Sequence, residues 1–235
     1  MNSQQIFAGG LAHPLAGLTA TLVVYAFAVR LHQACGRPAL LTPVFVAIVA
    51  MVAILGVFDV PHAQYFASAG VLHALLPAAF ALLTVAVWRQ HRAIGRDSVA
   101  VALIVPIGAA VGVMGTVLLT LLLHNSATMV ATLAVRSITT PVAVPLSESL
   151  GGIASIAAFA VIGSGVVGAT LGPAVLRRVG VRDERAIGLA LGVAAHAIGT
   201  AEAVRISERA GAFAVVGMVA TAFVGTIVVL VALGI

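Results

Sequence analysis

Residues 136–152 read Arg-Ser-Ile-Thr-Thr-Pro-Val-Ala-Val-Pro-Leu-Ser-Glu-Ser-Leu-Gly-Gly, and this stretch decides how the chain folds. It places two prolines, two adjacent glycines, one cation and one acid between long apolar runs. Proline breaks a helix, and irregular backbone at membrane depth is tolerated only inside protein or beside a polar cavity. If the flanking runs lie in lipid, the stretch is therefore predicted to hold the working site.

The composition places those flanking runs in a membrane. Of the 235 residues, 62% are hydrophobic and 8% are charged, whereas soluble domains carry roughly 25% charged residues. The twelve basic residues are all arginine, and they fall in short gaps between apolar runs, as in loops beside anionic lipid headgroups. Nucleic-acid binding is therefore not predicted, and neither is a metal or a cofactor, because one cysteine and scattered histidines build no ligand set.

Runs without charged side chains predict membrane-spanning helices, each of which needs about 20 residues. These runs cover residues 1–29, 38–58, 60–88, 98–135, 149–176, 186–201 and 210–235. The run 98–135 is too long for one helix, and His124-Asn125 is the expected break. The short run 186–201 continues into Glu202 and Arg205, which indicates a broken helix around residues 185–211. We expect an all-α, multi-pass membrane bundle that forms a single domain over residues 1–235.

Charge also predicts the side on which each loop lies. Arginines gather near residues 30–37, 89–96 and 177–185, and the positive-inside tendency places all three gaps in the cytoplasm. The third placement requires that residues 126–148 start and finish on the outer side. A re-entrant hairpin or two short half-helices are thus expected around residues 126–152. A possible internal repeat pairs Thr42-Pro43-Val44 with Thr140-Pro141-Val142, and Pro77 with Pro173.

The first group of candidate site residues lies within this hairpin. The permanent charge of Arg136 would attract an anion, while hydroxyls and the carbonyls freed by proline would hold a solute. The following serines and glycines resemble the start of a new helix, whose N–H groups would bind a carboxylate, and Glu148 could take up a proton during transport. The candidates are Arg136, Ser137, Thr139, Thr140, Pro141, Ser147, Glu148, Ser149, Gly151 and Gly152. The alternative is a kink or surface turn with Glu148 in outer water.

A second group lies in the run that ends in the polar turn. His196 is four residues before Thr200, so both share one helix face, and Gly199 with Thr200 could unwind the helix locally. Histidine in a helix commonly serves packing, but a polar ring among lipid-facing segments needs a partner. We therefore add His196, Gly199 and Thr200 to the substrate-binding candidates and predict no catalytic residue.

Both groups resemble the LrgB/CidB family of membrane proteins. The resemblance covers nearly the whole chain and is specific in its second half, with Arg136 where the family usually has lysine and Ala195 where serine is common. It rests on Arg136-Ser-Ile-Thr-Thr-Pro141, Ser147 to Gly152, Gly172-Pro173, Gly188-Leu-Ala-Leu-Gly192, His196-Ala-Ile-Gly-Thr-Ala201 and Gly211-Ala-Phe213.

The resemblance implies a bacterial inner-membrane protein that works beside a small LrgA/CidA-type partner. Family members are described as antiholin-like or holin-like regulators of murein hydrolase activity and cell lysis. Plant relatives are described as plastid glycolate/glycerate translocators, and bacterial members are linked to pyruvate movement.

Three functions follow from these patterns. The first is a proton-coupled transporter of small monocarboxylates such as glycolate, glycerate or pyruvate. The alternative is a holin-like or antiholin-like homo-oligomer that regulates murein hydrolases and lysis. The third is an intramembrane serine enzyme, for which Gly163-Ser164-Gly165 followed by His196 is a weak match, because Ile162 stands where that motif requires glycine. We expect that the protein is not an enzyme.

Overall fold

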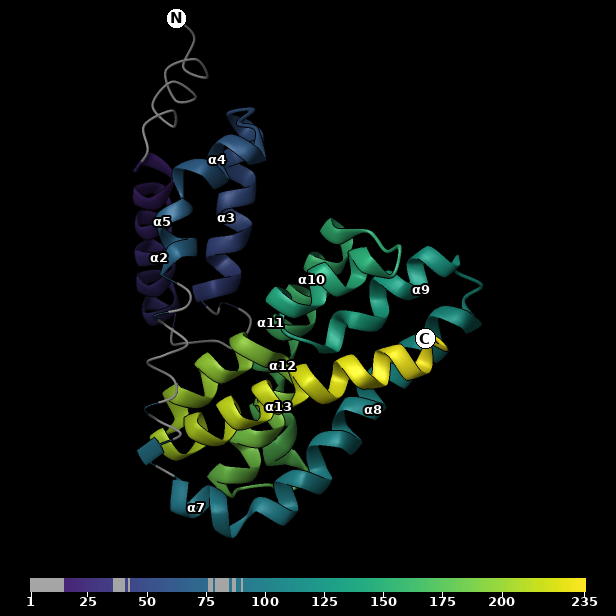
Figure 1. The fold of residues 1–235 in the computed structure, drawn as a ribbon. Helices are drawn as coiled ribbons and strands as arrows, with labels where there is room; N and C mark the ends of the chain where they lie inside the picture. The colour runs from purple at the N-terminus through teal and green to yellow at the C-terminus, as the bar shows by residue number, and fades with distance from the viewer. Residues whose placement is uncertain are drawn as a thin grey trace, which may run out of the picture. The chain divides into compact units, whose positions relative to one another are not determined.

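A computed structural model describes residues 15–35, 41, 43–75, 78, 85, 88–89 and 91–235. The chain divides into two compact units, residues 1–81 and 82–235 (Figure 1). The single domain predicted over residues 1–235 stays a prediction.

The first unit holds four helices in its described residues. They are α2 (Ala16–Ala34), α3 (Pro43–Val57), α4 (His62–Ser68) and α5 (Gly70–Ala74). α2 packs against α4, because Gly17 lies against Ser68 and the Thr21 hydroxyl is 2.8 Å from the Tyr65 hydroxyl. Of the predicted span 60–88, the described part forms only short helices, and much of its second half lies outside the described residues.

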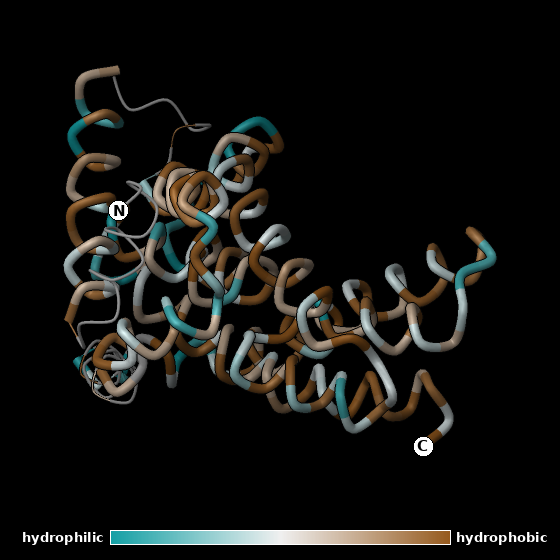
Figure 2. The backbone as a smooth tube through the Cα atoms, turned by 90° about the horizontal axis from the view of Figure 1, so that it is seen from above, coloured by the Kyte–Doolittle hydropathy of each residue, from teal (hydrophilic) through white to brown (hydrophobic). Residues whose placement is uncertain are grey.

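The second unit is also helical, with no strand in the residues that the structure describes. Its elements are α7 (His91–Arg96), α8 (Ser98–Leu122), α9 (Ala127–Ala134), the 3-10 turn η2 (Val135–Ser137), α10 (Thr140–Ser149), α11 (Ala154–Arg178), α12 (Glu184–Ile206) and α13 (Glu208–Ala232). By length and composition α8, α11, α12 and α13 could cross a membrane, and Figure 2 shows hydrophobic residues along most of this part of the chain. The predicted all-α membrane fold is confirmed.

α12 is a helical hairpin rather than one straight helix. His196 has φ 49° and ψ −131°, which are not helical values. Beyond this turn Gly199 packs against Leu191, and at the far end the Ser207 hydroxyl donates a 2.9 Å hydrogen bond to Glu184. The start and the end of α12 are therefore adjacent. The predicted break around residues 185–211 is confirmed, but the turn lies at His196 and not at Gly199–Thr200.

The packing of α13 supports the same conclusion. Gly188 lies against the carbonyl of Ala210, and Gly192, one turn later, lies against that of Ala214. The first half of α12 therefore runs parallel to α13, which lies beside it in Figure 1. Two consecutive parallel helices need a return segment between them, and residues 197–206 provide it. A side chain at either glycine would meet backbone, so this close approach requires glycine.

The first hairpin comprises α9, η2 and α10. The Ile153 N–H, which follows α10, donates a 2.9 Å hydrogen bond to the Thr132 hydroxyl of α9, so the chain returns along its own path. The irregular element predicted around residues 126–152 is confirmed. The prediction that residues 147–152 start a new helix is wrong. They end α10, because Gly152 N–H bonds to Ser147 C=O at 2.8 Å and Gly151 has φ 77°, a conformation common where helices end.

Both hairpin tips lie against the middle of α8. Gly108 packs against Val193 of the second hairpin, and Gly112 packs against Ser137 of the first. Either glycine, if it carried a side chain, would crowd its partner, so small residues allow the close approach that membrane helices use.

The tips also meet the middle of α11. The Ser164 hydroxyl donates a 3.2 Å hydrogen bond to the carbonyl of Arg136, and Gly168 packs against Ala195. From the start of α8, the contact with the second hairpin comes before the contact with the first hairpin. From the start of α11, this order is reversed. The two hairpins therefore enter the bundle from opposite ends, and their tips meet halfway along the spanning helices.

Candidate functional site at the hairpin tips

Arg136 is the cation of this site. Its Nε donates a 2.6 Å hydrogen bond to the Thr116 hydroxyl of α8, and this hydroxyl donates in turn to the carbonyl of Gly112 at 2.7 Å. The residue is half-buried. All seven acids of the chain lie in its described part, and none is within ion-pair distance of Arg136. The guanidinium is therefore oriented by the protein but has no counter-charge from it.

His196 provides the second polar group. Its side chain is 3% exposed, and neither ring nitrogen has a hydrogen-bond partner of acceptable geometry in the described residues. The ring nevertheless lies close enough to Arg136 and to the backbone of Ser137 to interact with both electrostatically. A buried imidazole without a partner is expensive, which indicates that a ligand or water completes its hydrogen bonds.

The start of α10 forms the third part of the site. Thr139 is the N-cap residue, and its side chain caps no backbone N–H. Thr140 begins the helix and Pro141 follows, at the end of a helix where proline is tolerated. Pro141 has no N–H, and the N–H groups of Val142 and Ala143 both bond to the carbonyl of Thr139. The N–H of Thr140 is therefore the donor left at the positive end of the helix dipole, directly after the tip that holds Arg136 and Ser137.

The remaining candidates of the first group lie at the other end of α10. Ser147 is fully buried, its hydroxyl lacks a partner in the described residues, and Gly152 packs against it and against Thr132. Glu148, Ser149 and Gly151 are exposed. The structure does not bring these residues to the tips, because about two helical turns separate Glu148 from Thr140.

Gly199 and Thr200 lie one turn beyond the second tip. Gly199 packs against the carbonyl of Leu191, and the buried Thr200 hydroxyl donates to the sulfur of Met218 at 3.8 Å. Both residues are close to His196 in the chain, but Gly199 packs against the first half of α12 and Thr200 contacts α13. They support the turn and do not extend the cluster of polar groups at Arg136.

Thr116 was missed from the sequence, and Ser164 was considered only as part of a weak enzyme motif and not as a residue of this site. Thr116 and Ser164 each lie in a long apolar run, where a single hydroxyl resembles an ordinary membrane-helix residue that bonds to its own backbone. The signal that the sequence offers is the position of each hydroxyl relative to nearby glycines. Thr116 follows Gly112 by one turn, and Ser164 stands at the centre of α11 between two glycines.

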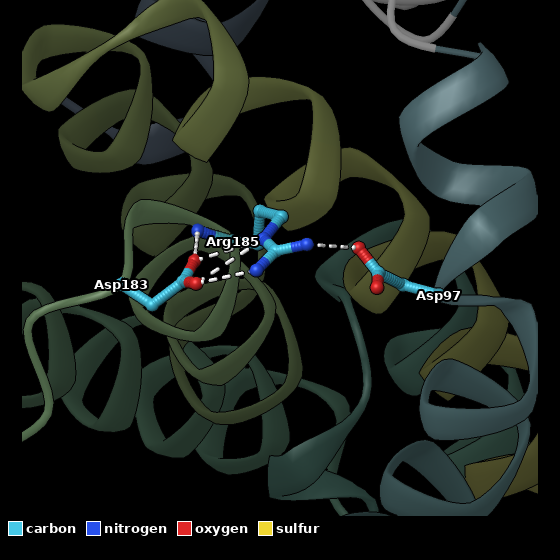
Figure 3. Close-up of polar contacts among 3 residues, drawn as sticks. All are labelled: Asp97, Asp183 and Arg185. Atoms are coloured by element: carbon cyan, nitrogen blue, oxygen red, sulfur yellow. Dashed lines mark hydrogen bonds and ion pairs between the residues drawn. The ribbon is translucent and has the colours of Figure 1, made fainter.

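A separate charged cluster lies where α8 and α12 begin. Arg185 lies between two carboxylates, 2.9 Å from Asp97 and 2.6 Å from Asp183 (Figure 3). The hydrogen bond from Arg185 lowers the pKa of Asp183 from its ordinary value of 3.8 to about 2. The cluster therefore joins the two helices through charge at any pH near neutrality.

The arrangement at the tips can bind an anion. Two neighbouring groups, Arg136 and the N–H of Thr140 at the start of α10, offer positive potential at the first tip, and the imidazole of His196 adds a polar contact. No group of three His, Cys, Asp or Glu residues in the described part of the chain could hold a metal ion.

A family model described as the LrgB-like family matches residues 21–235. The chain belongs to the LrgB-like family. The match includes both hairpins and the three helices against which their tips pack, so the site described here lies within the region that defines the family.

Three relatives resemble this LrgB-like chain over most of its length. The holin-like protein CidB of Staphylococcus aureus is 30% identical over 213 residues, 89% of this chain and 91% of its own. The protein YwbG of Bacillus subtilis is 29% identical over 88% of this chain and 92% of its own. A Haemophilus influenzae protein is 32% identical over 75% of this chain and 77% of its own. No solved structure matches the chain. The chain is thus a multi-pass membrane protein with holin-like relatives.

Proposed function

We propose that this LrgB-like protein is a secondary transporter of small monocarboxylates in the bacterial inner membrane. The observation that carries the proposal is the isolated charge of Arg136. Placing a charged side chain at membrane depth is costly, and such residues usually pair with another charge or line a substrate path. Since no acid of the chain pairs with Arg136, an anionic solute is the partner that the site needs.

The size of the solute follows from the packing around the tips. Gly112 and Gly108 bring α8 into contact with both hairpins, and Ile138 packs against Gly225 of α13. Close packing on these sides favours an acid of a few carbon atoms over a large one. The family's plant branch points to the same class, which includes glycolate, glycerate and pyruvate.

Proton coupling is a further part of the proposal. Glu148 is the acid nearest in sequence to the first tip, and it is exposed at the end of α10. It lies too far along the helix to touch an anion held by Arg136. Its part in coupling is therefore proposed separately from binding, and it has its own variant in the test.

Uptake into vesicles tests the proposal directly. Purified protein in sealed vesicles should accumulate labelled glycolate or pyruvate under a proton gradient. Arg136→Gln should abolish uptake. Glu148→Gln should still exchange one organic acid for another across the membrane, but its uptake should no longer depend on the proton gradient. Vesicles with the native chain that accumulate none of these acids would count against a transporter.

A holin-like role is the second candidate, and the printed name of the relative CidB favours it more directly than it favours transport. In this case the chain would form homo-oligomers, act with a small LrgA/CidA-type membrane partner and regulate murein hydrolases and lysis. A pore or scaffold of this kind needs no charge at the hairpin tips. In that case the Arg136→Gln variant would restore lysis control to a deletion strain as fully as the native chain does.

A further inference from the structure

The second unit contains the same series of elements twice. A 25-residue helix, α8, precedes the first hairpin, and a 25-residue helix, α11, precedes the second. A shift of 56 residues carries Ser98–Leu122 onto Ala154–Arg178, and a shift of 57 carries residues 127–149 onto Glu184–Ile206. The equal lengths, and spacings that differ by one residue, indicate an internal repeat. It differs from the predicted pairing, whose residues Thr42 and Pro77 lie outside the described part of the chain.

The contacts at the hairpin tips occur between corresponding residues of the two copies. Gly108 of α8 packs against Val193 of the second hairpin. In the other copy, Ser164 of α11 corresponds to Gly108, and Arg136 of the first hairpin corresponds to Val193. A hydrogen bond joins Ser164 to Arg136. A contact between the helix of one copy and the hairpin of the other therefore occurs in both directions.

A second pair of contacts agrees. Gly112 of α8 packs against Ser137 in its own copy, and the shifted residues, Gly168 and Ala194, also lie against each other. Because α8 and α11 meet the two hairpins in opposite order, the copies are inverted with respect to each other. Inverted copies with a site between them are the arrangement by which secondary transporters open alternately to the two sides.

A cavity lies where α8 and α12 begin. It has a volume of about 180 Å³, and apolar side chains from α8, α12 and α13 line it, including Ile104, Leu189 and Phe213. Ile104 is one turn before Gly108, and Leu189 is one turn before Val193, so the cavity ends about one helical turn from the contact between Gly108 and Val193. Asp97 and Arg185 stand at its wall.

The charged cluster has no counterpart in the other copy. The shift carries Asp97 onto Ile153 and Asp183 onto Ser126, both uncharged. Figure 3 shows that Arg185 joins the carboxylate of Asp97, which directly precedes α8, to that of Asp183, which directly precedes α12. The ion pair therefore holds the first half of α12, which belongs to the second hairpin, against the start of α8 in the first copy, beside the cavity.

We infer that residues 98–149 and 154–206 are inverted copies that open alternately, and that the Asp97–Arg185–Asp183 cluster is the latch that closes the cavity side. The purpose of the alternate opening rests on the proposed transport function, whereas the ion-paired latch itself does not depend on transport. Breaking the latch should increase the time during which the cavity connects the arginine-rich side to the tips.

Thiol labelling tests the latch without any substrate. A reporter variant carries Ser137→Cys at the first tip and Cys35→Ser to remove the exposed native thiol. A membrane-impermeant thiol reagent is applied to the arginine-rich side of sealed vesicles. Arg185→Gln should raise the labelling rate roughly two- to fivefold, the factor expected for a partly exposed ion pair. Asp97→Asn, which breaks the same bond from α8, should act in the same direction.

Arg182→Gln is the matched control, because Arg182 carries the same charge nearby and forms no ion pair with any described residue. Labelling in Arg185→Gln and Asp97→Asn that equals the control rate would overturn the latch, as would a reporter that stays unlabelled in both variants. A failure of uptake with a normal labelling response would instead remove only the transport function.

Discussion

Arg136 Nε lies 2.6 Å from the Thr116 hydroxyl, which links the tip of the first hairpin to the middle of α8. This hydrogen bond fixes the direction of the guanidinium and leaves its two terminal nitrogens for a ligand. The orienting hydroxyl comes from a helix outside the hairpin, so the shape of the site depends on how α8 packs against the tip.

Removing that hydroxyl should weaken the binding of an organic acid. A hydrogen bond to a charged group contributes about 1.5–3 kcal/mol, and part of this is lost when the guanidinium can rotate. We expect Thr116→Val to raise the dissociation constant about tenfold, and Thr116→Ser to restore it. Thermal stabilisation by graded glycolate or pyruvate measures the constant. Equal constants in the valine variant and the native chain would mean that Thr116 does not position Arg136.

His196 combines strain with function. A residue with a side chain at φ 49° and ψ −131° is less stable than glycine there by about 1–3 kcal/mol. His196→Gly should therefore unfold at a higher temperature than His196→Ala, while both variants lose acid binding. Unfolding in detergent, followed with and without acid, measures both effects. If the alanine variant were as stable as the glycine variant, the turn at His196 would be wrong.

The contact between α12 and α13 predicts an opposite pair of glycine effects. Gly192 lies against the backbone of Ala214, whereas Gly163 of α11 has no neighbour at the position of a side chain. Gly192→Ala should destabilise the protein by about 1–3 kcal/mol through overpacking. Gly163→Ala should stabilise it by roughly 0.5–1 kcal/mol, because alanine favours helix. The two unfolding temperatures decide, and stabilisation of both variants would exclude parallel packing of these helices.

The pH dependence of the latch follows from the lowered pKa of Asp183. A carboxylate whose pKa is lower in the folded chain stabilises that chain above its ordinary pKa of 3.8, and the effect is lost as pH falls through about 2. Asp183→Asn should therefore be less stable than the native chain at neutral pH, by a small margin because the side chain is 48% exposed. Thermal unfolding between about pH 2 and pH 7 should show this margin shrinking only below about pH 4. A margin that is unchanged at pH 2 would contradict the pairing with Arg185.

The sequence predicted the first hairpin but not its details. The arginine-rich gaps required residues 126–148 to begin and end on the same side, and the hairpin agrees with this requirement. The serines and glycines at 147–152 were interpreted as a helix start, although glycine after a helix is typical of its end. Local composition did not distinguish the two, whereas the bond from Gly152 to Ser147 does.

The second hairpin was harder to predict, because its turn has no local signal. Glycine at 199 suggests a break, but the reversal occurs at His196, whose φ of 49° and ψ of −131° are a combination that residues with a side chain rarely adopt. Gly199 serves the packing of the returning half against Leu191. Tertiary contacts therefore decide where this helix turns, and Thr116 likewise joins the site only through packing.

Equilibrium binding of a labelled acid to Arg136→Gln tests the central claim most directly. The purified native chain and Arg182→Gln should bind glycolate or pyruvate saturably, since Arg182 carries a similar charge outside the hairpin tips. Arg136→Gln, if folded by its unfolding temperature, should show no saturable binding. Binding by Arg136→Gln with the native affinity would contradict the account.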